Sequence, residues 1–361
     1  MRRRLALFLL VAVATTPGSR KACAAVATPV EADFVLSDFR FSTGERLPEL
    51  KIHYRTLGAP RRDAAGIARN AVLILHGTTG TGKQFLTENF AGVLFGPGQL
   101  LDATTHYLVL PDGIGHGGSS KPSDGLHARF PRYGYDDMVE AHYRLLTEGL
   151  RVNHLELVLG TSMGGMHTWV WGERHPDFMD GLVPLASVPA QIAGRNRMLR
   201  KMAMDDIRDD PDWNGGEYRV QPRGLRSAVQ VLLFMVSSPL GWQKAAPTRD
   251  AADHFLDEQM KARLAAVDAN DFLYAFDASR DYDPSKDLEK ITAPLLAINS
   301  ADDQVNPPEL GLMEKLIARV RRGRFVLIST SGETRGHGTH SFPAVWQNYL
   351  REFLEKLEPK S

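Results

Sequence analysis

Short apolar runs rich in branched residues alternate along the chain with segments of helical periodicity. Two early runs, residues 34–41 and 50–57, alternate apolar and polar positions as half-buried strands do. Six later runs are almost continuously apolar, and they cover residues 71–75, 107–110, 155–159, 181–186, 294–298 and 325–328. Helical patterns lie between the strands at residues 135–148, 163–173, 310–320 and 342–357. This alternation predicts an α/β fold whose mostly parallel sheet is covered by helices on both faces.

One stretch interrupts the alternation of strands and helices. Residues 191–289 are mostly helical in pattern, are rich in methionine and contain breakers such as Pro211 and Pro239. Methionine at such positions usually fills gaps in packing. We therefore expect a helical cap inserted over the carboxyl edge of the sheet, with residues 25–190 and 290–361 forming the core.

The first 24 residues have the plan of a secretory signal peptide. Three arginines at residues 2–4 precede an apolar run at residues 5–14, and small residues at 22–24 form a cleavage site. The apolar run is too short to span a bilayer comfortably, so we expect cleavage and export to the periplasm or the outside of the cell rather than an N-terminal anchor. After cleavage we expect no stable membrane insertion.

Composition excludes several classes of protein. Hydrophobic residues make up 43% of the chain and charged residues 24%, which is typical of a soluble globular protein. The 43 basic and 43 acidic side chains balance, so there is no field to attract nucleic acid. Cleavage after residue 24 would remove Cys23, the single cysteine, so we expect neither a disulfide nor a thiolate metal site.

A G-x-S-x-G pattern at residues 160–164 stands directly between a predicted strand and a predicted helix. In this setting the serine occupies a sharp, strained turn that raises its hydroxyl above the sheet, and the flanking glycines leave room for the turn. The pattern alone is common by chance, but its place after a buried strand favours a catalytic role. Ser162 is thus the candidate nucleophile of an acyl-transfer reaction.

An acyl-transfer serine needs donors for the oxyanion that develops on the substrate. One is expected from the backbone N–H of the next residue, Met163, and another from the loop after the third strand. That loop, residues 76–80, reads His-Gly-Thr-Thr-Gly, and we choose the Thr78 N–H. The alternative is that His76 and the glycines only form a tight turn.

The serine also needs a base and a carboxylate that orients the base, in the chain order Ser, Asp or Glu, His. Asp302 and Asp303 both follow the strand at residues 294–298, and Asp303 is preferred. His337 and His340 both follow the last strand. His337 is preferred because glycines flank it, as a histidine lying closely over the serine would need.

Several further motifs resemble the homoserine O-acetyltransferase-like branch of the α/β hydrolases. Residues 135–141, Tyr-Asp-Asp-Met-Val-Glu-Ala, resemble the family's T-V-x-D-M-V-x-A, and Gly-Gly-Met at 164–166 continues the serine motif in the same way. In the cap, residues 210–218 resemble D-P-x-W-x-G-G-x-Y, and residues 268–274 resemble another family segment. The resemblance runs from about residue 33 to the C-terminus.

This resemblance implies an α/β-hydrolase fold with an eight-stranded sheet and a triad of Ser162, Asp303 and His337. It also offers a homodimer as the candidate assembly. Val229 and Val236 fall where the family has an arginine and a tyrosine, and Gly338 stands where an aspartate follows the histidine. An arginine and an aspartate suit a zwitterionic amino acid, so we do not expect homoserine as the substrate.

Three hypotheses for function follow from these residues. The first is an exported carboxylic-ester hydrolase that acts on a small-molecule ester through an acyl-enzyme and needs no cofactor or metal. The second is an O-acyltransferase with the same triad, which passes the acyl group to an alcohol. The third is a non-catalytic binding module, against which the complete set of candidate catalytic residues argues.

Overall fold

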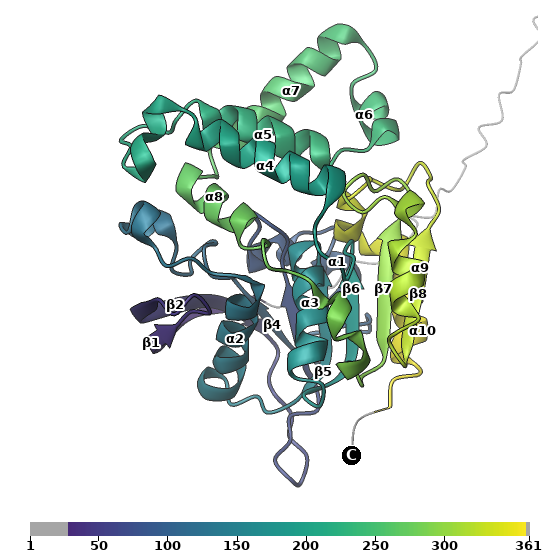
Figure 1. Ribbon diagram of the computed structural model, residues 1–361. Helices are drawn as coiled ribbons and strands as arrows, with labels where there is room; N and C mark the ends of the chain where they lie inside the picture. The colour runs from purple at the N-terminus through teal and green to yellow at the C-terminus, as the bar shows by residue number, and fades with distance from the viewer. Residues whose placement is uncertain (1–27, 359–361) are drawn as a thin grey trace, which may run out of the picture.

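The computed structural model describes residues 28–358 and contains one eight-stranded sheet in the order β1-β2-β4-β3-β5-β6-β7-β8 (Figure 1). β1 pairs antiparallel with β2, and β2 pairs antiparallel with β4, whereas all later pairs are parallel. The strands are β1 (Val30–Arg40), β2 (Arg46–Leu57), β3 (Ala71–Leu75), β4 (Tyr107–Pro111), β5 (Leu155–Thr161), β6 (Met179–Leu185), β7 (Leu295–Ser300) and β8 (Gly323–Ile328).

Helices cover both faces of the sheet because the central strands are apolar on both. In β3, Leu73 and Leu75 face the core under α2 (Tyr135–Arg144), α3 (Met163–Arg174) and α9 (Leu312–Ile317). Val72 and Ile74 face the opposite core, under α1 (Ala91–Leu94) and α10 (Pro343–Leu354). The continuous apolar runs of the sequence are therefore strands with two buried faces. The predicted fold class, an α/β-hydrolase fold with a mostly parallel eight-stranded sheet, is confirmed.

Five helices lie between β6 and β7 and form a layer above the sheet (Figure 1). They are α4 (Gly194–Arg208), α5 (Gly224–Met235), α6 (Pro239–Ala245), α7 (Arg249–Leu264) and α8 (Ala269–Asp277). This cap has its own apolar core, in which Met204 and Met260 pack with residues such as Leu225 and Phe272. These two methionines fill the interior of the cap, whereas Met198 and Met202 are exposed.

Hydrogen bonds join the two segments of the cap that resemble the family's motifs. The Tyr218 hydroxyl donates to Asp268 Oδ1 at 2.7 Å, and Trp213 Nε1 donates to Asn270 Oδ1 at 2.9 Å. Asp268 also caps α8 by accepting from the Asn270 backbone N–H. Residues 210–218 and 268–274 therefore join α8 to the loop that follows α4.

The expected signal peptide, residues 1–24, lies outside the described residues. Between residues 28 and 358, no helix combines the length and the apolar character needed to cross a bilayer.

Candidate active site

Ser162 lies in a sharp turn between β5 and α3, and its backbone is left-handed with φ 55° and ψ −112°. This conformation is strained for any residue other than glycine. Glycine is required on both sides because a Cβ at Gly160 would lie 1.9 Å from the Gly164 carbonyl oxygen, and one at Gly164 would lie 2.0 Å from the Leu75 carbonyl oxygen. The close approach of these backbones fixes the turn and raises Ser162 above the sheet.

The structure brings together the three predicted residues of the triad. His337 Nε2 lies 2.7 Å from Ser162 Oγ, and His337 Nδ1 lies 2.9 Å from Asp303 Oδ2. The imidazole therefore lies between the hydroxyl and the carboxylate, each within hydrogen-bond distance. With Nδ1–H donating to Asp303, Nε2 is free to accept the serine proton.

Asp303 is completely buried, and hydrogen bonds stabilise its negative charge. Oδ1 accepts from the Val305 N–H at 2.7 Å, and Oδ2 accepts from Asn306 Nδ2 at 3.1 Å. Burial alone would raise the pKa of the Asp303 carboxyl, but the neighbouring His337 and these hydrogen bonds outweigh burial and lower the pKa below its usual value. Asp303 is therefore ionised at neutral pH.

Asp302, the alternative acid, forms hydrogen bonds with the loop that carries the imidazole. Its Oδ2 accepts from the Gly336 N–H at 2.9 Å and from Thr334 Oγ1 at 2.9 Å, while Ser300 Oγ donates to Oδ1. Consecutive aspartates thus have separate tasks. One contacts the histidine, and the other fixes the backbone immediately before it. The sequence contained no signal for this second task.

The loop at residues 76–80 passes directly beside the serine. A Cβ placed on Gly77 would lie 3.4 Å from the Ser162 Cβ, so the loop backbone is in van der Waals range. Burial lowers the pKa of His76 to about 4, so its ring is neutral. Its Nδ1–H donates to the Gly77 carbonyl at 2.8 Å and its Nε2 accepts from the Gly113 N–H at 2.9 Å. These bonds fix the peptide group that includes the Thr78 N–H, while Met163 begins α3 on the other side of Ser162.

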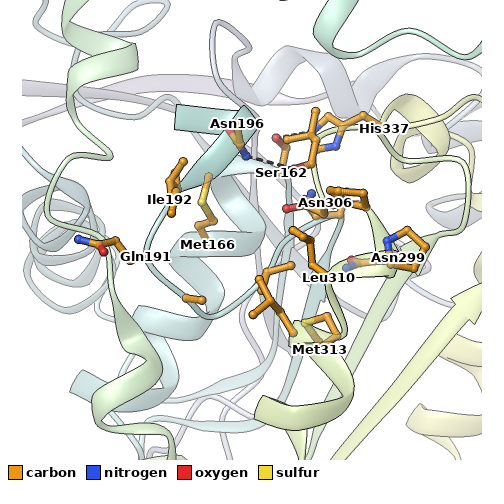
Figure 2. A pocket seen from close by; sticks show the side chains of 18 of the residues that line it. Ser162, Met166, Gln191, Ile192, Asn196, Asn299, Asn306, Leu310, Met313 and His337 are labelled. Atoms are coloured by element: carbon orange, nitrogen blue, oxygen red, sulfur yellow. Dashed lines mark hydrogen bonds between the residues drawn. The ribbon is translucent and has the colours of Figure 1, made fainter. Parts of the chain in front are cut away.

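Two hollows meet at Ser162 and His337. The first has a volume of about 740 Å³ and extends from the serine toward Leu310 and Met313 (Figure 2). Its walls are largely apolar, with Met166 and Ile192 on one side, and Asn196 lies near its catalytic end (Figure 2). This hollow suits a hydrocarbon part of a substrate.

The second hollow, of about 830 Å³, lies on the side of residues 77–79 and is bounded by the cap. Val236 and Gly338 line it, as their positions in the family-like motifs indicated, whereas Val229 is buried in the core of the cap. Two arginines that the sequence analysis missed, Arg200 and Arg263, also line this hollow. They lie on cap helices without a local motif, so no signal in the sequence identified them.

Comparisons with known proteins agree with this geometry. Residues 70–334 match the family described as alpha/beta hydrolase fold. The chain belongs to that family. A probable acyltransferase of Methanothermobacter thermautotrophicus is 28% identical over 77% of this chain and 84% of its own length. A homoserine O-acetyltransferase of Haloferax prahovense is 30% identical over 78% of this chain and 75% of its own length. These relatives confirm the homoserine O-acetyltransferase-like branch of the α/β hydrolases.

A solved structure extends the likeness to an α/β hydrolase with another activity. The crystal structure of esterase E22 superposes with a TM-score of 0.77 at 20% identity, covering 91% of this chain and all of that one. Its similarity is one of fold. The chain is thus an α/β-hydrolase-fold enzyme of the serine hydrolase and acyltransferase type.

The separate tasks of the two aspartates can be tested through stability. Asp302→Asn replaces one acceptor oxygen by an NH2 group that faces other donors, so we expect the free energy of unfolding to fall by about 1–3 kcal/mol. Denaturant unfolding followed by tryptophan fluorescence measures the change. Asp281→Asn is the matched control because that side chain is 80% exposed. Equal stability of Asp302→Asn and the control would contradict the anchoring role.

Proposed function

We propose that this chain is an exported carboxylic-ester hydrolase in which Ser162, His337 and Asp303 form a catalytic triad. The observation that carries the proposal is the continuous line of hydrogen bonds from Ser162 Oγ through His337 to Asp303 Oδ2, of 2.7 Å and 2.9 Å. The buried, ionised carboxylate and the strained turn at the serine support it. Nucleophile, base and orienting acid are thus in the arrangement that serine catalysis needs.

The first half of the reaction makes an acyl-enzyme. Ser162 Oγ bonds to the ester carbonyl carbon while its proton moves to His337 Nε2. The backbone N–H groups of Thr78 and Met163 donate to the oxyanion of the tetrahedral intermediate. The intermediate then breaks the bond to the alcohol oxygen, which takes the proton from His337 Nε2. Asp303 stabilises the imidazolium that exists between these steps.

The second half releases the acid. A water molecule gives a proton to His337 Nε2 and bonds to the acyl carbon, and a second tetrahedral intermediate forms. Collapse of this intermediate breaks the bond to Ser162 Oγ, which recovers the proton. No cofactor or metal enters either half, so the side chains and amides named here complete the chemistry.

Export is part of the proposal because residues 1–24 have the charged, apolar and small-residue segments of a signal peptide. An enzyme outside the cytoplasm meets water and extracellular esters rather than cytoplasmic thioesters. We expect mass spectrometry of the secreted protein to show a chain that begins at Ala25. Retention of residues 1–24 would contradict this prediction.

Replacement of the nucleophile tests the triad. We expect the mature protein to hydrolyse p-nitrophenyl acetate and butyrate, and Ser162→Ala to lower kcat by at least about a thousandfold because the acyl-enzyme cannot form. A fluorophosphonate probe should label the wild-type protein at Ser162 and leave the variant unlabelled. Ser227→Ala, an exposed serine on α5, serves as the control. Undiminished activity in Ser162→Ala would end the proposal.

The second candidate function is O-acyl transfer, which the relatives named acyltransferases favour. An alcohol would then take the place of water in the second half of the reaction. CoA release from acetyl-CoA, measured with and without homoserine or glycerol, separates the two functions. For a hydrolase we expect equal rates with and without the alcohol and no acylated alcohol in the mass spectrum. Faster release together with an O-acetyl product would identify a transferase.

A further inference from the structure

The first hollow has Arg200 and Glu314 among its mostly apolar lining, whereas the hollow beside residues 77–79 has two arginines. Arg200 and Arg263 both line it together with Ser162 and His337. Its remaining walls are neutral. They include the apolar side chains Leu232, Met235, Val236 and Phe276, and no aspartate or glutamate is among the described residues that line it. Two arginines thus line a space that reaches Ser162.

Arg200 is held by neutral groups alone. Its side chain lies on α4 and is almost completely buried, at 4% exposure. Nε–H donates to Asn196 Oδ1 at 3.0 Å, a terminal N–H donates to Ser279 Oγ at 3.2 Å, and the guanidinium carbon lies 5.4 Å from the centre of the Phe276 ring. Burial lowers the pKa of Arg200, but a guanidinium remains charged at neutral pH. The side chain is therefore fixed in place with its charge uncompensated.

Arg263 lies on α7 and carries a second uncompensated charge. Its Nε–H is buried and has no acceptor among residues 28–358. Burial lowers the pKa of Arg263, and no neighbouring carboxylate counteracts this effect. Among the described residues, no aspartate or glutamate lines the hollow, and no carboxylate is among the groups that shift the pKa of Arg200 or Arg263.

A buried and a half-buried cation without a counter-ion are costly, and an anion bound in the same hollow would offset that cost. We propose that this hollow binds a carboxylate of the substrate, so that the enzyme acts on esters with an acidic group a few carbons from the ester bond. Guanidinium groups bind carboxylates through paired, charge-assisted hydrogen bonds. The apolar wall of Leu232, Met235 and Val236 suits the carbon chain that joins the two functional groups. This inference rests on the proposed ester chemistry at Ser162.

The motifs argue against zwitterionic homoserine, and a site for an anion agrees with that expectation. Val229, at the place of the family's arginine, is buried in the core of the cap, whereas Arg200 and Arg263 bring positive charge to the hollow from other helices. Gly338 provides no anion to bind an ammonium group. The hollow therefore favours a substrate with a net negative charge over a zwitterion.

Matched pairs of esters test the proposal and show which part of the substrate carries the carboxylate. Mono-p-nitrophenyl glutarate is compared with p-nitrophenyl valerate for an acidic acyl group, and 4-acetoxybenzoate with phenyl acetate for an acidic alcohol. In one pair we expect the charged ester to have a kcat/KM at least about tenfold higher than the neutral one.

Arg263→Gln should lower that charged-to-neutral ratio by about tenfold or more. Arg200→Lys, which keeps the charge but loses the planar fork, should lower it by less.

The matched control is Arg249→Gln, at the start of the same helix α7, where the arginine side chain is 89% exposed. We expect it to leave the ratio unchanged. Equal losses on the charged and neutral esters in Arg263→Gln would overturn the proposal, and so would a wild-type enzyme with no preference in either pair.

A binding measurement keeps this inference separate from the proposed function. Calorimetric titration of the Ser162→Ala protein with glutarate needs no catalysis, and we expect binding that is at least about tenfold weaker when Arg263→Gln is added. If no ester is hydrolysed but glutarate binds in this way, the ester chemistry fails and the anion site stands. Absence of glutarate binding, or tighter binding of inorganic phosphate than of glutarate, would overturn the carboxylate assignment.

Discussion

The backbones of β3, β5 and α3 meet in van der Waals contact beneath Ser162. Gly160 packs against the Gly164 carbonyl, and Gly164 packs against the Leu75 carbonyl, with no room for a Cβ at either position. Because α3 lies so close to both strands, the chain can enter it only through the left-handed conformation of Ser162. The hydroxyl is thereby raised above the sheet, on the side of the loops that follow β3, β7 and β8. His337 there lies within hydrogen-bond distance of the hydroxyl.

Much of the core, and the grouping of Ser162, Asp303 and His337, was readable from the sequence for a physical reason. The strands are buried on both faces, so their apolar runs are continuous, and all eight were found close to their observed bounds. Ser162 directly follows β5, Asp303 lies in the short turn after β7, and His337 stands between two glycines, so local chemistry constrains each residue type. Their mutual distances in the structure match the roles that their order along the chain suggested.

The residues that the sequence did not reveal act across long separations. Arg200 and Arg263 lie on two cap helices, and each is an ordinary helical arginine when its own segment is considered. Their shared hollow exists only because the cap packs over the loop at residues 76–80. The second hollow thus depends on how two layers meet, whereas the position of Ser162 depends on a turn of five residues.

The turn after β7 has to place two carboxylates, those of Asp302 and Asp303, for two separate contacts. Asp303 accepts from the imidazole, and Asp302 accepts from the Gly336 amide just before it. A one-residue insertion or deletion after β7 would shift both carboxylates together, so the length of this turn has no freedom to drift during evolution. The cap is joined to the core by longer connections and has no such constraint. Its helices can lengthen, shorten or exchange side chains, and new substrates can arise there while the turn after β7 stays unchanged.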